Sequence, residues 1–522
     1  MKEQHLQQMT KHKSISMKNT NWPALLIVLF TLNVFPLVMH DHYFDINRFK
    51  VRCLMIAVVS LFPFWLLRPD WILEFIKRLM HDRRILELYS VLGFFLCLCT
   101  LSAARFKWNN AILWGNDGRY SGLFFILTCS AVFLMSSTLH TGNTHLWRII
   151  RITTLIVSLL GILNTMGRDP IGFYIGIKKG QEDYFVSTIG NTDFFGAWIA
   201  MMYPLTTGEN LRNGNDLYSM ATLILTAFIM SIGTVASRSD CAFGAMLIIC
   251  LLRIALTGDD WRQMARANLL CAILWISFPI MRGLLFYGWF DIRLKGVAAF
   301  ICKSHIGILL SVFHTWACAI CFKTKQTGTS PLGRKKMIRV LAFLCLSCIL
   351  LSLILIFYFT CVNQTHELGF AEDLLRFNDS WGSRRGFIWA RALRAFSDFS
   401  LADKLFGKGL DTAQRILTPY FDKPSMLSYG VFNDTHNQIL QYLVTTGLFG
   451  AIALVVFHLN LIRLAYHRID INPVCTDDLA MLCGYSLIAF LSVSQPILLA
   501  TYACLAGLAV SHSLSEGELY ES

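Results

Sequence analysis

The sequence predicts an all-α, polytopic membrane protein with about 12 to 14 transmembrane helices and one large extracytoplasmic loop. Three observations lead to this fold class. Of the 522 residues, 55% are hydrophobic and only 15% are charged, whereas soluble domains carry about 25% charged residues. The mean hydropathy is +0.52. The apolar residues also gather in runs of about 20, which is the length of a helix that crosses a bilayer.

About fourteen apolar runs are candidate spans. They lie near residues 22–40, 51–67, 86–104, 120–138, 149–166, 191–206, 217–236, 241–257, 269–290, 297–322, 338–360, 437–462, 479–494 and 496–513. The first run follows a lysine-containing polar segment, and no small-residue cleavage site comes after it. We therefore expect a retained anchor and not a removed signal peptide.

Lysine and arginine are enriched in short cytoplasmic loops, so their distribution predicts the orientation. The basic loops are 68–85, 258–268, 323–336 and 463–475. All four become cytoplasmic when the N-terminus is placed inside. These loops hold much of the basic excess behind the net charge of +13. Topology and contact with anionic membrane lipid explain that excess, and we expect no nucleic-acid partner.

The same orientation places one long polar segment, 361–436, on the extracytoplasmic side. Loops of this length are usually functional or disordered, and the aromatic content here favours an ordered lid. Within 384–399, four residues share one helical face: Ile388, Ala392, Ala395 and Phe396. The predicted organisation is a cytoplasmic tail, transmembrane helices with short loops, the large loop, C-terminal transmembrane helices and a tail. Their boundaries are 1–21, 22–360, 361–436, 437–513 and 514–522.

Several polar residues converge on the extracytoplasmic edge of the predicted spans, where ionisable groups are functional candidates. They are Arg119, Asn191, Arg238, Arg384, Arg385, His436 and Asn437. Guanidinium groups bind phosphate oxygens in a bidentate way and stay charged at physiological pH. Histidine can take up a proton near neutral pH. This combination suggests a phosphorylated lipid that acts as a leaving group, with an attacking hydroxyl oriented or deprotonated by imidazole.

Each of these residues also has a structural interpretation. An arginine at a membrane interface often anchors a helix, and a histidine at a helix start is often a cap. Arg238 is harder to explain in this way, because "SRSD" interrupts an apolar stretch. Two CxxC pairs, Cys318 with Cys321 and Cys345 with Cys348, have metal-ligand spacing. Thiolates are costly in hydrocarbon, however, so we expect no metal and no cofactor.

These motifs resemble the O-antigen ligase and polymerase superfamily. The similarity is carried by Arg385 with Trp389, by "LFGKGLDT" (405–412), by His436 with Asn437, and by Gly447 eleven residues after the histidine. Earlier stretches are similar too: "GRYSGL" (118–123), "GRDPIGF" (167–173), "IGNTDFFGAWIAMMYPL" (189–205) and "ASRSD" (236–240). One departure is Asp193, which stands where the family has asparagine.

The resemblance implies a multi-helix membrane fold of the C type used by lipid-dependent glycosyltransferases. The donor would be an undecaprenyl-pyrophosphate-linked glycan at the outer face of the bacterial cytoplasmic membrane, and an acceptor hydroxyl on a glycan, lipid or protein would attack with inversion, without a metal. Arg238 and Arg385 would hold the pyrophosphate, with Arg119 as a weaker candidate, and His436 would activate or position the acceptor. Ligases and polymerases share this donor chemistry and differ in the acceptor.

A different class of protein, a transporter or a flippase for lipid-linked glycans, also needs many spans and buried arginines. It predicts polar residues near mid-membrane and often repeated halves with broken helices. Here the candidate residues gather at one edge, and the single large loop is asymmetric. The sequence therefore favours the transferase.

Overall fold

The computed structural model describes residues 21–139, 144–178, 180–258, 260–289, 294, 296–324, 333–421, 432–492 and 495–514. Of the predicted tails at 1–21 and 514–522, all residues except Asn21 and Leu514 lie outside these ranges. Among the described residues, nine helices are long and apolar enough to cross a membrane, and the shorter apolar helices Trp22–Leu37 and Leu123–Ser137 accompany them. The protein is therefore an all-α, multi-pass membrane protein, as predicted.

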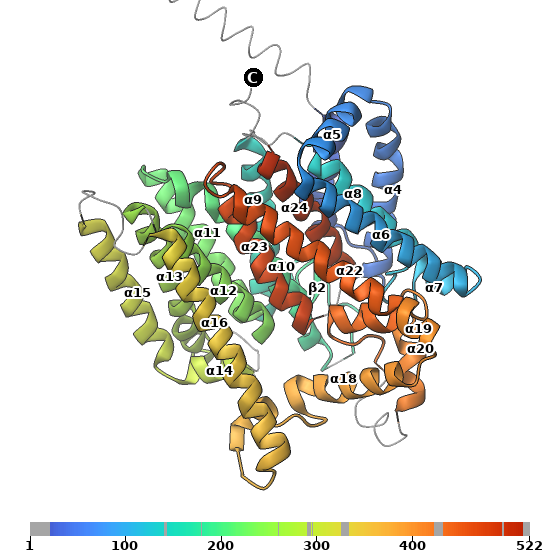
Figure 1. Ribbon diagram of the computed structural model, residues 1–522. Helices are drawn as coiled ribbons and strands as arrows, with labels where there is room; N and C mark the ends of the chain where they lie inside the picture. Colours follow the sequence, from blue (N-terminus) through green and yellow to red (C-terminus); the bar gives the residue numbers. More distant parts are fainter. Residues whose placement is uncertain are drawn as a thin grey trace, which may run out of the picture.

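The described part of the first half forms helices and one small two-stranded sheet (Figure 1). They are α2 (Trp22–Leu29), continued by the π-helix η1 (Phe30–Val34) and α3 (Phe35–Leu37), then α4 (Ile46–Leu66), α5 (Pro69–His81), α6 (Arg83–Arg105), α7 (Asn110–Trp114), α8 (Leu123–Ser137), α9 (Thr144–Thr165), α10 (Thr192–Asn213), α11 (Leu217–Ala236) and α12 (Asp240–Leu256). A 3-10 turn (Glu182–Tyr184) precedes two antiparallel strands, β1 (Phe185–Val186) and β2 (Gly190–Asn191).

The second half contains the remaining spans and a group of short helices. Its elements are α13 (Trp261–Phe286), α14 (Gly296–Lys303), α15 (Ile306–Lys323), α16 (Arg334–Phe357) with the π-helix η3 (Tyr358–Val362), η4 (Gly369–Ala371), α17 (Glu372–Leu375), α18 (Trp381–Ser397), α19 (Leu401–Phe406), α20 (Ala413–Leu417), η5 (Thr418–Tyr420), α22 (Gln438–Arg468), α23 (Cys475–Leu491) and α24 (Pro496–Leu514).

Every predicted span coincides with a helix, but the run 297–322 is wrong as a single span. The structure divides it into α14 and α15, with a break at Ser304 and His305. The hydroxyl of Ser304 accepts a hydrogen bond from the backbone N–H of Ile306 at 3.4 Å. This local bond competes with the helical pattern. A hydropathy average over the run does not detect such a break.

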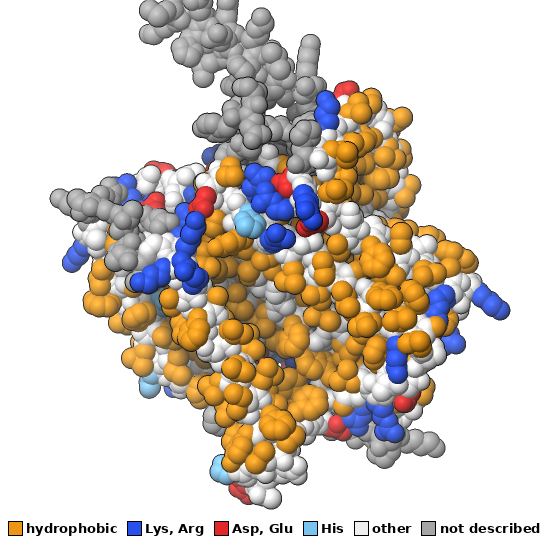
Figure 2. All heavy atoms as spheres, in the orientation of Figure 1, with side chains coloured by type: hydrophobic (Ala, Val, Ile, Leu, Met, Phe, Trp, Pro, Cys, Tyr) orange, Lys and Arg blue, Asp and Glu red, His pale blue; other side chains and the backbone are white. Residues whose placement is uncertain are grey.

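The spans differ in how deeply they lie in the bundle. In α24, 94% of the apolar window is buried, whereas in α16 none of it is. Helix α24 packs against α8 and α22, and α10 packs against α11 and α23. Figure 2 shows hydrophobic side chains across the middle of one face, with lysine and arginine gathered above and below them. This distribution is typical of a membrane protein, whose lipid-facing surface must be apolar.

Residues 363–421, which we call the cap, cover one end of the bundle (Figure 1). The cap has its own core, in which Phe387, Ile388, Ala392 and Ala395 of α18 pack against Leu440 and Val444 of α22. The predicted amphipathic face of 384–399 is confirmed, since Phe396 also packs against this core. The shared core fixes α18 relative to the first turns of α22.

A close backbone approach also joins the cap to α22. The N–H of Gly409 donates to the carbonyl oxygen of Thr445 at 2.9 Å, and that of Lys408 donates to Val444 at 3.3 Å. Gly447 has φ +76°, and a Cβ there would collide with the backbone of Leu405. Glycine is needed here for both its positive φ and its missing side chain. Gly447 thus permits the close approach of the cap to α22.

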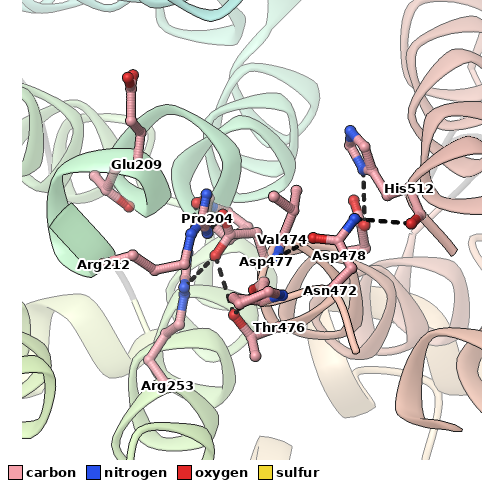
Figure 3. A network of polar contacts seen from close by, with 12 residues as sticks. Pro204, Glu209, Arg212, Arg253, Asn472, Val474, Thr476, Asp477, Asp478 and His512 are labelled. Carbon is pink, nitrogen blue, oxygen red and sulfur yellow. Dashed lines mark hydrogen bonds and ion pairs between the residues drawn. The ribbon is translucent and has the colours of Figure 1, made fainter. Parts of the chain in front are cut away.

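The opposite end of the bundle holds a buried ionic network (Figure 3). Asp477 of α23 is paired with Arg212 of α10 and Arg253 of α12. The next residue, Asp478, lies 2.9 Å from Nδ1 of His512 in α24. Buried charges are tolerated when they are paired in this way. The network ties four of the central helices together, far from the cap.

Candidate functional site

His436 lies in a tight turn directly before α22. The side chain of Asn437 caps the helix by accepting the N–H of Leu440 at 2.9 Å. His436 itself has φ +48°, which is uncommon for a residue with a side chain. Its backbone N–H donates to Oδ1 of Asp434 at 2.7 Å, and its ring Nδ1 lies 3.4 Å from the same oxygen. The turn therefore presents the imidazole at the helix start, with 39% of the side chain exposed.

Helix α18 brings Arg385 to this turn. The indole N–H of Trp389 donates to the carbonyl oxygen of Thr435 at 3.0 Å. Residues four apart lie on one helical face, so Arg385 is one turn away from this contact. Its Nε donates to the carbonyl of Leu491 and its Nη1 to that of Gly382, both at 2.7 Å. These bonds hold the guanidinium in place, and its Nη2 has no protein acceptor among the described residues.

Arg119 approaches the same turn from the loop between α7 and α8. Its guanidinium forms an ion pair with Asp434 and donates to Oδ1 of Asn433 at 3.1 Å. The side chains of Arg119 and Asp434 are only 6% and 3% exposed. Arg119 is therefore engaged in holding the turn that presents His436. Arg385 differs from Arg119, because the N–H donors on its Nη2 are not used by the described part of the protein.

Asp411 of the cap anchors the Arg119 loop from the other side. Its Oδ2 accepts the backbone N–H of Asn116 at 2.7 Å and that of Ser121 at 3.4 Å. Burial raises the pKa of Asp411 to about 6, although the nearby charge of Arg119 and the two backbone donors act in the opposite direction. The carboxyl group thus joins the cap to the loop that carries Arg119.

The electrostatic surroundings keep His436 neutral. The protein packed around the ring and the positive charges of Arg119 and Arg385 lower the pKa of His436 well below its ordinary value. The carboxylate of Asp434 does not reverse this direction, because its charge is paired with Arg119. Since both guanidinium groups influence one ring, the structure brings these three predicted residues together.

Arg238 occupies the turn between α11 and α12 with φ +60°. Its guanidinium pairs with Oδ1 of Asp183 at 3.1 Å, and among the described residues no hydrogen bond or ion pair joins it to His436 or Arg385. Asp240, two residues later, interacts electrostatically with both Arg385 and Asp193. The turn that carries Arg238 is therefore a neighbour of the Arg385 region, although the side chain itself points to another partner.

The remaining predicted residues have structural contacts of their own. Asn191 caps α10, where its Oδ1 accepts the N–H of Asp193 at 2.8 Å. Arg384 is exposed and has φ +74°, in a left-handed stretch with Gly382 and Ser383. This stretch turns the chain into the regular part of α18. No group of three or more histidine, cysteine or acidic residues that could hold a metal occurs in the described part of the chain.

Sequence reasoning missed Asp434, Asp411 and Asn433. Asp434 pairs with Arg119 and lies beside His436, and Asp411 interacts electrostatically with Arg119. Both stood inside stretches already singled out, Asp411 at the end of "LFGKGLDT" and Asp434 two residues before the histidine. Their position beside these motifs was the one feature of the sequence that could have indicated a role in the site. Their partnership with Arg119 is visible only in three dimensions.

A known family model covers part of this site. Residues 292–455 match the family model described as O-antigen ligase. This region of the chain is therefore similar to the O-antigen ligase family. The matched range contains α18, the close approach of the cap to α22 and the turn with His436, while Arg119, Asn191 and Arg238 lie outside it. No curated protein matches the chain. The predicted resemblance to the O-antigen ligase superfamily is thus confirmed, and the family suggests a glycosyltransferase-like membrane enzyme.

Proposed function

We propose that this protein transfers or polymerises a glycan from an undecaprenyl-pyrophosphate-linked donor onto an acceptor hydroxyl, at the outer face of a bacterial cytoplasmic membrane. The observation that carries the proposal is the placement of His436 within the field of Arg119 and Arg385, in a chain with an O-antigen ligase domain. The product would be a cell-surface polysaccharide. Glycan, lipid and protein acceptors all offer the required hydroxyl.

The donor pyrophosphate would bind to Arg385, whose Nη2 is available. Arg238 would be a second ligand, with the phosphate replacing the carboxylate of Asp183, whose side chain is 56% exposed. Arg384 adjoins Arg385 and would add positive charge. Asn191 and Asn437 use Oδ1 as a helix cap, so each Nδ2 remains a donor for the substrate.

In the transfer step, the acceptor oxygen attacks the anomeric carbon of the first sugar and the bond to the pyrophosphate oxygen breaks. The electron pair leaves with undecaprenyl pyrophosphate, and the configuration inverts. The acceptor proton passes to Nε2 of His436, since Asp434 at 3.4 Å favours a proton on Nδ1. Fixed guanidinium groups stabilise the leaving charge without a metal.

Binding of the donor would also raise the pKa of His436. In the free protein, positive charge contributes to the low pKa of His436. A pyrophosphate beside Arg385 offsets that charge and so raises the affinity of the imidazole for a proton. His436 would then become an effective base only once the donor is in place.

The lipid part of the donor also has a suitable environment. A cavity of about 240 Å³ lies between α6, α8, α22, α23 and α24, and its lining is mostly apolar. Gln438, the first residue of α22, lines it, so the cavity begins two residues from His436. An isoprenoid chain fits such a lining, because burial of apolar surface favours binding.

The proposal is tested in cells that express wild type, His436→Ala or Arg385→Ala at matched levels. Arg394→Ala is the control, because Arg394 is an exposed arginine on the same helix. We expect both site variants to accumulate lipid-linked precursor, while the control behaves as wild type. Loss of the whole surface glycan indicates a ligase, and a surface glycan of single units indicates a polymerase. Unchanged glycan in both variants would refute the site and favour a transporter.

A further inference from the structure

A pocket of about 630 Å³ opens at the end of the bundle opposite the cap. Its walls come from two segments far apart in the chain, the start of α16 and the end of α22. The lining residues are Gly333, Arg334, Lys335, Lys336, Arg339, Tyr466, His467, Ile469 and Asp470. Nothing in the proposed transfer reaction uses this pocket, which lies far from His436.

The lining carries a strong positive charge. Arg334 is paired with Asp470 at 2.6 Å, and Asp470 is the only acidic residue in the lining. Lys335, Lys336 and Arg339 are exposed and have no carboxylate partner among the described residues. Three positive charges therefore converge without compensation. A ligand with several negative oxygens is the natural complement.

The pocket also stands at the edge of the apolar belt. Directly after the basic residues, α16 exposes Val340, Phe343 and Leu344, which are 45%, 68% and 53% exposed. An apolar helix that buries none of its window in the bundle must face hydrocarbon. A ligand in the pocket would thus have its charged part among the lysines and an apolar part along α16.

We propose that this pocket binds the phosphate-bearing headgroup of an anionic phospholipid, with the acyl chains along the exposed face of α16. Basic pockets at membrane edges suit such headgroups. The continuous apolar stripe favours a lipid over a soluble phosphate compound. The bound lipid would bridge α16 to the end of α22, which the ion pair between Arg334 and Asp470 also joins. It would stabilise the attachment of a helix that has little packing of its own.

The test uses the full chain in nanodiscs of phosphatidylcholine, alone or mixed with phosphatidylglycerol. Lipid affinity is measured by native mass spectrometry, and the midpoint of thermal unfolding by a thiol-reactive dye. The pocket variant is Lys335→Gln/Lys336→Gln/Arg339→Gln. The control removes three exposed basic residues that do not line the pocket, with Lys77→Gln/Arg83→Gln/Lys323→Gln. A basic residue near anionic lipid contributes about fivefold in affinity, so the pocket variant should lose at least tenfold for phosphatidylglycerol.

We expect the control to keep most of the affinity, and both variants to unfold at the wild-type temperature in phosphatidylcholine alone. Only the pocket variant should lose the stabilisation given by phosphatidylglycerol. Equal losses in the two variants would overturn the proposal, because general surface charge would explain them. Asp470→Asn gives an independent check if the pocket variant folds poorly. It removes the single acidic group and should raise the affinity about fivefold, and an unchanged affinity would contradict the proposal.

Discussion

The buried ion pair between Arg119 and Asp434 gives the sharpest prediction. Both side chains are almost fully buried, and removing one partner of such a pair leaves an uncompensated charge that costs about 3–5 kcal/mol. We therefore expect Arg119→Gln and Asp434→Asn to be strongly destabilised as single variants. The double variant places two neutral amides in the same space. It should recover most of the lost stability.

The effect is measurable as a shift in the thermal midpoint. The unfolding entropy of a chain of this length is about 1.1 kcal/mol/K, so the single variants should unfold about 3–5 °C below wild type. The chain supplies its own reporters, because ten of its sixteen cysteines are buried and react with a thiol dye only on unfolding. The double variant should lie within about 1 °C of wild type.

A measurement of transfer activity in the same variants distinguishes two roles for Arg119, a structural role in the His436 turn and direct contact with the substrate. If Arg119 acts by holding the turn of His436, the double variant should recover a substantial part of the transfer activity along with its stability. Recovery of stability with no recovery of activity would show that Arg119 contacts the substrate directly. Additive losses in the double variant would refute the ion pair itself, since independent residues do not compensate each other.

Four further predictions concern the site and its support. His436→Gln should lower transfer at least about a hundredfold with an unchanged thermal midpoint, and near-normal turnover would exclude its role as a base. Gly447→Ala should reduce the folded yield, because the added Cβ would collide with the backbone of Leu405. Gly93→Ala is the control, since a Cβ at that position has no atom within 4 Å. Equal yields of the two variants would contradict the close approach of the cap to α22. Asp411 has its pKa raised to about 6, so its folded form binds a proton more tightly than the unfolded chain. Stability should therefore fall by about 3 kcal/mol as the pH rises from about 4 to 6, and Asp411→Asn should lack this dependence; identical pH profiles would contradict the shift. Transfer should persist after treatment with a chelator, and a loss that added metal restores would contradict the guanidinium mechanism.

The helical fold was accessible from the sequence because transmembrane helices are selected by one local property. A run of apolar residues must satisfy its backbone hydrogen bonds internally in lipid, so hydropathy alone locates it. The same average fails where a few polar atoms end a helix, as Ser304 does between α14 and α15. It also says little about depth, since α16 and α24 are both apolar but differ completely in burial.

Part of the candidate site could also be predicted from the sequence, for a related reason. Arg385 and His436 are conspicuous as charged or titratable residues beside apolar runs, and the structure brings them together through Trp389 and Thr435. The role of Arg119 was not accessible, because its hydrogen-bond partner Asn433 is 314 positions away. Such a pairing depends on the packing of α8 against distant helices. The pairing of Arg238 with Asp183 has the same origin.

The central claim is tested most directly by reconstitution. Purified protein in proteoliposomes is supplied with an undecaprenyl-pyrophosphate-linked glycan and an acceptor, and the released undecaprenyl pyrophosphate is quantified together with the new glycosidic product. The account predicts equal amounts of both from wild type and neither from His436→Gln, with inversion at the anomeric carbon. Release and product formation that persist in His436→Gln, or movement of intact donor across the bilayer without cleavage, would contradict it.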